Sequence, residues 1–342
     1  MAHPAHVHLF KHSIRELEKK GHEIRVVSRD KDLSLSLLRE NGLDFTCLSR
    51  AGKRFGLLLE YPLHLANLLR FCLRWRPDLM VNSPGGFVAP VGILLGIPTV
   101  AFSDTEHANL QNLLSFPWVN WVITPSFFRK RLGRKQVIHE SSHQLAHLHP
   151  KRFTPDISVL KEIGLSEGEP FFVLRFVAWA AAHDSGHHGF SEAGKRRIVH
   201  ELSKLGKVLI TSESPLPEDL KPYQVQVAAS RLHSLLSYAT LYLGEGATTA
   251  LEAAVLGTPS IYVSTIWTGA TEEMEKRYEL LRTTKDEEEA LGWALKWAAA
   301  PDIQQEWQEK RKRLLQDKQD LTDFFVHWLE KWDASRKTRE SL

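Results

Sequence analysis

The stretch YLGEGATTALEAAVLGTPSIYV, residues 242–263, predicts a strand, a glycine turn, a helix and a second strand. The apolar run that ends at Gly244 is typical of a buried strand, and the helix is expected from Thr248 to a stop at Gly257. Such a unit is typical of parallel strands joined by a crossover helix. The turn also suits an anion such as a diphosphate, because a helix N-terminus presents free N–H groups and a positive dipole end.

The same rhythm continues on both sides of this unit. Upstream, FFVLRFVAW and KVLITSE read as apolar strands separated by a helix over 192–205. Downstream, EEEALGWALKWAAA reads as a helix, and a long charged helix is expected over 304–331. We therefore predict a Rossmann-like domain over 151–303, with the helix 304–331 free to pack back on the preceding domain.

Residues 1–150 predict another Rossmann-like domain, with a strand from Glu23 to Ser28, an amphipathic helix from Leu57 to Trp75, and later strands in PDLMVNS, PTVAFSD and VNWVITPS. Only Met1 and Ala2 precede HPAHVH, where a domain of this type normally begins with a strand. Either that first strand is missing or the true start lies upstream. The fold expected is thus α/β, with two doubly wound domains that face a central ligand cleft.

Composition excludes several classes of protein. The 342 residues are 43% hydrophobic and 25% charged, as in soluble globular proteins, and a net charge of +3 argues against nucleic acid as a partner. Two cysteines and no visible signal peptide fit a cytoplasmic protein. The basic and apolar stretch over 54–76 is more typical of a core-facing helix than of a membrane contact, so any membrane contact is expected to be at most peripheral.

RFVAWAAAHDSGHHGFS, residues 175–191, follows the first strand of the second domain and is dense in polar residues. Arg175 and His183, with the backbone at Gly186 and Gly189, are candidates for stabilising a leaving diphosphate. The alternative for Arg175 is a structural salt bridge. Density of this kind in a loop after a strand favours a binding site.

Two segments of the first domain, HPAHVH and SDTEHANLQN, offer candidates for a general base. Asp104, Glu106 and His6 are the side chains able to take a proton from an acceptor hydroxyl. The alternatives are a helix N-cap for Asp104 and a solvated His6.

The 242–263 stretch resembles the donor-binding motif of GT-B proteins, G-x-G/A-T-x-x-E-A-x-x-x-G-x-P. The resemblance implies that Glu252 binds ribose, while the turn binds diphosphate through the residues Gly244, Gly246, Thr248 and Thr249. With HPAHVHLFK, KKGHEIRVVSRDKD and RFVAWAAAHDSGHHGFS, the whole chain is similar to the domain of unknown function 354 family in the GT-B superfamily. Similarity to that family implies the GT-B fold and a nucleotide-sugar ligand, but it does not imply a particular reaction.

Three functions remain open. The first is a metal-independent glycosyltransferase for polysaccharide biosynthesis, with a nucleotide-sugar substrate, no cofactor, and a saccharide or lipid-linked acceptor. The second is a non-hydrolysing nucleotide-sugar 2-epimerase, whose catalytic Glu and His match Glu106 and His183. Against it, VNSPGG and the positions Trp118 and Asn120 lack two carboxylates of that site. The third is a non-catalytic nucleotide-sugar-binding protein.

HESSHQLAHLH, residues 139–149, has the spacing of a zinc protease. That pattern needs a glycine where Ala146 stands, and Pro150 follows at once. The preceding RKQVI predicts a strand, which leaves His139 at a strand end instead of inside a helix. We therefore expect no metal site here, and interpret the stretch as the last turn of the first domain.

Overall fold

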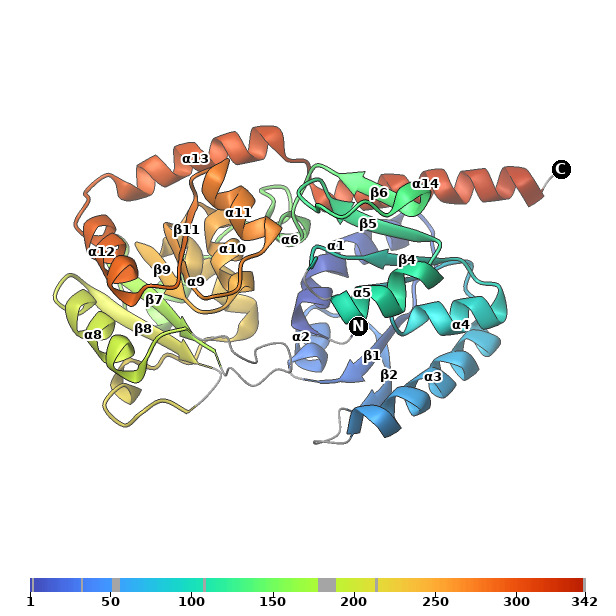
Figure 1. The fold of residues 1–342 in the computed structure, drawn as a ribbon, viewed down its shortest axis with the longest axis horizontal. Helices are drawn as coiled ribbons and strands as arrows, with labels where there is room; N and C mark the ends of the chain where they lie inside the picture. The colour runs from blue at the N-terminus through green and yellow to red at the C-terminus, as the bar shows by residue number, and fades with distance from the viewer. Residues whose placement is uncertain are drawn as a thin grey trace. The chain divides into compact units, whose positions relative to one another are not determined.

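The computed structural model describes residues 1, 3–31, 33–50, 56–106, 109–177, 189–212 and 215–340. The chain divides into two compact units, which Figure 1 shows as ribbons. Unit 1 combines Met1–Arg152 with Lys318–Leu342, and unit 2 is Phe153–Asp317. All strand pairs in the described sheets are parallel, so the predicted α/β class with parallel sheets is confirmed. None of the described helices combines the length and the apolar character that crossing a membrane requires.

Unit 2 is built on a five-stranded parallel sheet in the order β11-β10-β9-β7-β8. The chain starts at β7, adds β8 on one side, and then crosses to the other side for β9, so the sheet has a switch point between β7 and β9. Its strands are β7 (Phe171–Phe176), β8 (Lys207–Ser212), β9 (Leu241–Gly244), β10 (Ser260–Val263) and β11 (Leu281–Thr284). Its helices are α7 (Ser158–Glu162), α8 (Glu192–Leu202), α9 (Leu232–Tyr238), α10 (Ala247–Leu256), α11 (Gly269–Lys276), α12 (Glu287–Ala298) and α13 (Ile303–Asp317).

The central strands of unit 2 are almost entirely buried because helices cover both faces of the sheet. Every residue of β9 and β10 is buried, which is typical of a parallel sheet enclosed in this way. The crossover helix α10 ends at Gly257, whose φ of +80° is a left-handed conformation that favours glycine. The pattern read from residues 242–263 therefore forms the centre of this unit.

Unit 1 contains two parallel sheets, β1-β2 and β3-β4-β5-β6. Its strands are β1 (Val26–Asp30), β2 (Phe45–Arg50), β3 (Met80–Asn82), β4 (Thr99–Phe102), β5 (Trp121–Pro125) and β6 (Gln136–His139). Its helices are α1 (Pro4–Lys19), α2 (Ser34–Glu40), α3 (Gly56–Trp75), α4 (Val88–Leu95), α5 (Asn109–Ser115), α6 (Leu145–Leu148) and α14 (Leu321–Glu340). The C-terminal α14 packs against α1 although the two are far apart in sequence (Figure 1).

The single helix predicted over 304–331 is wrong, because the structure has two helices there, α13 and α14. Asp320 provides the reason. Its carboxylate accepts the backbone N–H of Thr322 at 2.8 Å, which is an N-cap interaction that begins a new helix. The Arg152 guanidinium donates to the same carboxylate at 2.7 Å and holds the start of α14 on the body of unit 1.

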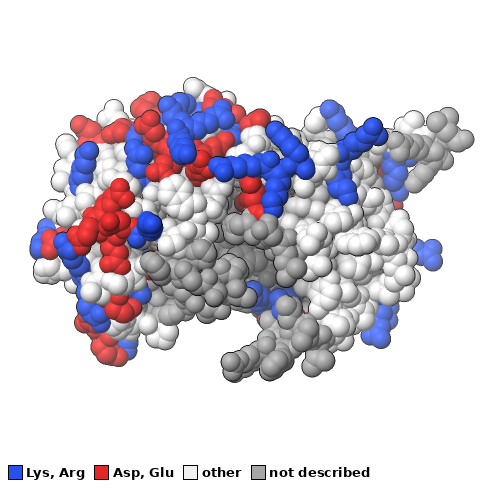
Figure 2. Space-filling view, viewed as in Figure 1, with Lys and Arg blue, Asp and Glu red and all other residues white. Residues whose placement is uncertain are grey.

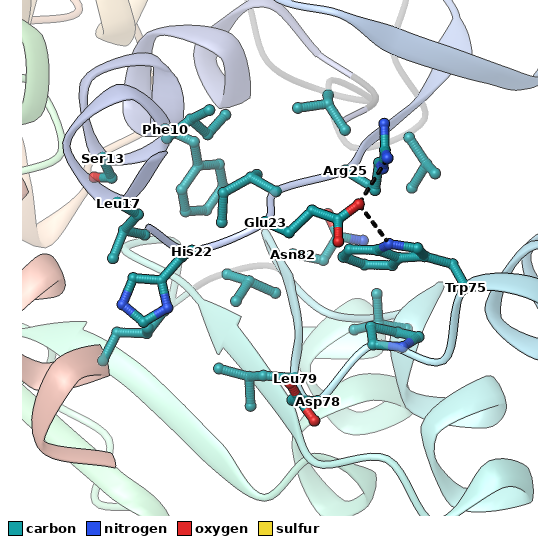
Figure 3. A pocket seen from close by; sticks show the side chains of 18 of the residues that line it. Phe10, Ser13, Leu17, His22, Glu23, Arg25, Trp75, Asp78, Leu79 and Asn82 are labelled. Carbon is teal, nitrogen blue, oxygen red and sulfur yellow. Dashed lines mark hydrogen bonds and ion pairs between the residues drawn. The ribbon is translucent and has the colours of Figure 1, made fainter. Parts of the chain in front are cut away.

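A cavity of about 350 Å³ lies between the two sheets of unit 1. Figure 3 shows its lining, in which Glu23 accepts a hydrogen bond from the Trp75 indole at 3.1 Å. At one side, the Met1 ammonium donates to the carbonyl of Val27, and the Met1 carbonyl accepts the N–H of Arg29 at 2.9 Å. Met1 thus pairs with β1 as a residue of a parallel strand would. The lining does not include the candidate site residues, so this cavity is a feature of the fold.

Two histidines of unit 1, the buried His64 and the half-buried His12, should make the stability of the protein depend on pH. Burial lowers the pKa of His64 to about 4, assisted by the positive Met1 terminus, and burial also lowers that of His12 to about 4. An unfolded chain restores a pKa of about 6.5, so the unfolded state takes up protons first as the pH falls. We expect full stability above roughly pH 6.5 and a falling melting temperature from there to roughly pH 4.

Thermal unfolding followed across this pH range tests the prediction. The variant His64→Gln should flatten the pH dependence, whereas His200→Gln, at an exposed position, should leave it unchanged. A melting temperature that is constant or rises on acidification would contradict the assignment.

Candidate functional site

The candidate donor site of unit 2 lies where β7 and β9 end side by side. Arg175 of β7 is paired in register with Gly244 of β9, and the Glu245 N–H donates to the Arg175 carbonyl at 3.1 Å. Val177 follows β7, and a short turn at Glu245 and Gly246 follows β9 and leads into α10. Ligands of open parallel sheets bind at such a switch point, beyond the carboxyl ends of the strands.

Glu245, in the turn before α10, binds the backbone on both sides of the stretch 178–188. The sequence did not identify it as a site residue. Its side chain is 2% exposed, and its two oxygens accept the N–H groups of Val177 at 2.9 Å and Phe190 at 2.7 Å. Gly189 leaves room for this contact, since a Cβ there would lie 2.4 Å from Glu245 Oε1. Val177 and Phe190 are therefore both held by one buried carboxylate. The sequence offered one sign of this role, because Glu245 is a charged residue in a turn between a buried strand and a buried helix.

The first turn of α10 supplies the chemistry for an anion. Gly246 is the N-cap, and within the described structure its helix has no side-chain cap, which leaves the N-terminal N–H groups facing outward. Thr248 is exposed and Thr249 is buried in that turn. The Arg175 Nε lies 3.9 Å from where a Cβ on Gly246 would be, so the guanidinium lies beside the same turn. A cation and helix N–H donors at one place suit a diphosphate.

Six residues expected from the sequence to bind the donor therefore lie together: Arg175, Gly189, Gly244, Gly246, Thr248 and Thr249. His183 and Gly186 lie outside the described residues. Glu252 lies further along α10 and is buried, with Oε1 3.2 Å from Nε2 of His233. A ribose contact at Glu252 stays a prediction, and the carboxylate would share that contact with His233.

Two glycines of this turn allow binding to be separated from folding. In Gly244→Ala the new Cβ would lie 2.3 Å from the Tyr242 hydroxyl and 2.9 Å from the Arg175 carbonyl, so we expect a loss of about 1–3 kcal/mol of stability. In Gly246→Ala the nearest atom, a Val177 methyl, is 3.4 Å away, so the protein should fold normally. The methyl would still cover the turn, and nucleotide-sugar affinity should fall by roughly tenfold.

Urea unfolding measures the first effect and calorimetric titration the second. Equal stability of Gly244→Ala and wild type would contradict the packing described for β9. Unchanged affinity in Gly246→Ala would place the diphosphate elsewhere.

In unit 1, two strand ends bring a carboxylate to an imidazole. Asp104 follows β4 and His143 follows β6, and Asp104 Oδ2 lies 3.1 Å from His143 Nδ1. The Thr105 hydroxyl donates to the other Asp104 oxygen at 3.0 Å. The second ring nitrogen of His143, Nε2, is buried and has no hydrogen-bond partner among the described residues. A carboxylate that holds Nδ1 leaves Nε2 as the basic nitrogen, which is the arrangement of a general base.

The other two base candidates differ in their surroundings. His6, in the first turn of α1, is held neutral, because burial, and to a smaller extent the neighbouring Met1 terminus, His3 and His143, lower its pKa well below the ordinary value. Glu106 accepts the N–H of Arg129 at 2.8 Å, and Lys130 Nζ donates to its backbone carbonyl at 3.2 Å. Asp104, with His143, thus has the clearest geometry for proton transfer, and Glu106 anchors the loop after β5.

The HExxH spacing of residues 139–143 does not lie on a helix. His139 ends β6, and the residues from Glu140 to Gln144 form a bend and turn before the short α6. Burial lowers the pKa of His139 well below its ordinary value, and the neighbouring His143 adds to the shift. Because zinc proteases place both histidines on one helical face, this stretch lacks their geometry.

The chain is similar in sequence and in structure to several known proteins. It is 24% identical over 270 residues to the uncharacterized protein MJ0665 of Methanocaldococcus jannaschii, which covers 75% of this chain and 78% of that protein. The UDP-GlcNAc 2-epimerase of Neisseria meningitidis, solved with UDP-GlcNAc, is similar at a TM-score of 0.68 and 11% identity, covering 96% of this chain and 98% of that one. The glycosyltransferase SsfS6 of Streptomyces sp. SF2575, solved with thymidine diphosphate, gives 0.60 and 14%, covering 94% and 95%.

At these identities the solved structures show the fold, which is the GT-B fold shared by glycosyltransferases and UDP-GlcNAc 2-epimerases. The predicted pair of Rossmann-like domains is thereby confirmed. The family described as protein of unknown function (DUF354) matches residues 1–330, nearly the whole length. The chain therefore belongs to the DUF354 family.

Proposed function

We propose that the protein is a glycosyltransferase that uses a nucleotide-sugar donor. Unit 2 binds the donor diphosphate at the turn before α10, and unit 1 supplies the base that activates an acceptor hydroxyl. The pairing of Asp104 with His143 carries the proposal, because it adds a base suited to an acceptor. Relatives of the same fold that were solved with thymidine diphosphate or UDP-GlcNAc support a nucleotide ligand.

In the proposed reaction, His143 Nε2 takes the proton of the acceptor hydroxyl. The acceptor oxygen attacks the anomeric carbon of the sugar, and the bond from that carbon to the diphosphate oxygen breaks. The electron pair leaves with the nucleoside diphosphate, where Arg175 and the N–H groups of α10 stabilise the new charge. Asp104 holds the imidazole in the required tautomer and stabilises its protonated form.

We propose that this transfer needs no metal ion. A divalent cation would serve to stabilise the charge of the leaving diphosphate. Arg175 and the first turn of α10 place a permanent cation and fixed N–H donors at that position, and these can perform the same electrostatic task. Equal transfer rates with and without a chelator are expected.

Transfer is favoured over epimerisation by the side chains that follow β3 and those that precede β5. A 2-epimerase removes and returns protons on the sugar and needs several acids and bases around it. After β3 the chain continues with Ser83 and Pro84, which carry no titratable group. Asn120 accepts the Thr99 N–H at 2.8 Å and is committed to the backbone. These positions supply no carboxylate to the site.

A thermal-shift panel of UDP-, GDP-, CMP- and dTDP-sugars tests donor binding. A ligand present at a hundred times its dissociation constant should add about 2.7 kcal/mol of stability. We expect one base to give a clear rise in melting temperature, and Gly246→Ala to reduce that rise. If no nucleotide-sugar shifts the transition, unit 2 is not a donor site and the proposal fails.

A further inference from the structure

Exposed hydrophobic side chains of unit 1 concentrate on one layer of helices. Thirteen large hydrophobic side chains are exposed among the described residues, and eight of them lie on α3, α4, α5 and the short 3-10 turn Phe116–Trp118. Leu94, Leu113 and Leu114 are 68%, 67% and 62% exposed. The eight, here called the apolar surface, are Tyr61, Leu63, Leu73, Ile93, Leu94, Leu113, Leu114 and Trp118.

The helices that carry these residues pack side by side. α3 contacts α4, while α4 and α5 both contact the 3-10 turn. The Tyr61 hydroxyl donates to the Gly86 carbonyl at 2.9 Å, which joins α3 to the start of α4. Successive right-handed crossovers from β3 to β4 and from β4 to β5 place α4 and α5 on the same face of the sheet. In Figure 2, the part of unit 1 where Figure 1 shows these two helices bears few charged side chains.

The stretch of sequence that carries the apolar surface is mainly basic. From Tyr61 to Lys135 the chain has eight basic residues and three acidic ones. The acids are engaged: Asp78 with Arg336, Asp104 with His143, and Glu106 with the loop after β5. The basic residues are Arg70, Arg74, Arg76, Arg129, Lys130, Arg131, Arg134 and Lys135.

Two groups of these bases lie at the apolar surface itself. Arg70 and Arg74 are exposed on α3, on the same outer side as Leu73. Lys135 Nζ donates to the carbonyls of Phe116 at 3.1 Å and Pro117 at 3.0 Å, directly beside Trp118. Cations therefore lie next to exposed leucines and to an exposed tryptophan and tyrosine.

We propose that the apolar surface docks on the anionic face of a lipid bilayer. Leucine and isoleucine side chains on a helix layer insert among acyl chains, while Trp118 and Tyr61 suit the headgroup level. Arginine and lysine beside them are attracted by acidic lipid headgroups. Resting on the proposed function, this surface makes a lipid-linked saccharide the acceptor class, because the base of unit 1 then works on a molecule held at the bilayer.

Sedimentation with vesicles tests the docking without any donor or acceptor. Wild-type protein should bind vesicles of phosphatidylserine and phosphatidylcholine, bind pure phosphatidylcholine much less, and dissociate as salt is raised. The variant Leu94→Glu/Leu114→Glu should lose vesicle binding by roughly tenfold or more. The matched control Ile157→Glu/Leu205→Glu changes two exposed side chains of unit 2 and should bind as wild type does.

For each variant, the rise in melting temperature caused by the preferred nucleotide-sugar is measured as well. Loss of vesicle binding with an unchanged shift would support the docking surface and show an intact unit 2. The docking proposal would be overturned if wild-type protein does not bind anionic vesicles, or if the control and surface variants bind them equally. Neither result would affect the proposal for donor binding. Self-association abolished by Leu94→Glu/Leu114→Glu, with no vesicle binding, would assign the surface to a second copy and also overturn it.

Discussion

Replacing His143 with alanine should lower the rate of sugar transfer by roughly 10²- to 10⁴-fold, the range that general-base catalysis contributes. Donor binding should stay unchanged, because His143 belongs to unit 1 and the nucleotide contacts belong to unit 2. The expected signature is thus a lower kcat with an unaltered thermal shift by nucleotide-sugar. Steady-state rates measured with one acceptor at saturating donor would report it.

Asp104→Asn separates the roles within the pair. Asparagine keeps the size of the side chain but loses the charge that stabilises the imidazolium, so a smaller kcat loss and an altered pH profile are expected. His200→Ala, at an exposed position in unit 2, is the matched control and should retain full activity. Full activity in His143→Ala would remove the pair from the mechanism and leave His6 and Glu106 as the remaining bases.

Replacing Glu245 should have the largest effect on stability in unit 2. In Glu245→Ala two N–H groups, the partly buried one of Val177 and the buried one of Phe190, lose their acceptor, and each unsatisfied group costs about 1–3 kcal/mol. We therefore expect a loss of about 2–5 kcal/mol, together with weaker nucleotide-sugar binding because Val177 and Phe190 lose the carboxylate that holds them beside the turn before α10. Denaturant unfolding and calorimetric titration measure the two effects.

Glu245→Gln tests whether the charge or the shape matters. The amide of glutamine keeps one acceptor but turns its nitrogen toward an N–H donor, so it should recover only part of the lost stability. Glu218→Gln, whose side chain is 87% exposed, controls for the change in charge and should unfold as wild type does. A Glu245→Ala variant as stable as wild type would show that the loop does not depend on this carboxylate.

The sequence predicted the fold well because parallel strands covered on both faces are mostly apolar, and runs such as those ending at Phe176 and Gly244 are easy to recognise. Helix ends marked by Gly257 were equally visible. The break between α13 and α14 was not, since charged residues continue through it. It depends on the N-cap that Asp320 makes with Thr322 and on Arg152, which contacts Asp320 although the two are far apart in sequence.

The candidate sites were predicted in part for the same reason. Gly246 and Thr248 stand in a local motif that one stretch of sequence contains. Glu245 stands in the same motif, but its partners Val177 and Phe190 come from another strand and loop, so only the folded sheet reveals its task. In the sequence, His143 belongs to a zinc-protease spacing. In the structure its partner is Asp104, which follows a different strand.

Release of free nucleotide from the preferred nucleotide-sugar, measured with and without acceptor, tests the central claim most directly. Lipid extracts and soluble saccharides serve as acceptors, with sugar incorporation followed in parallel. The account predicts nucleotide release and sugar incorporation that both require acceptor, proceed with chelator present, and are lost in His143→Ala. Conversion of the nucleotide-sugar into its 2-epimer in the absence of acceptor would contradict it.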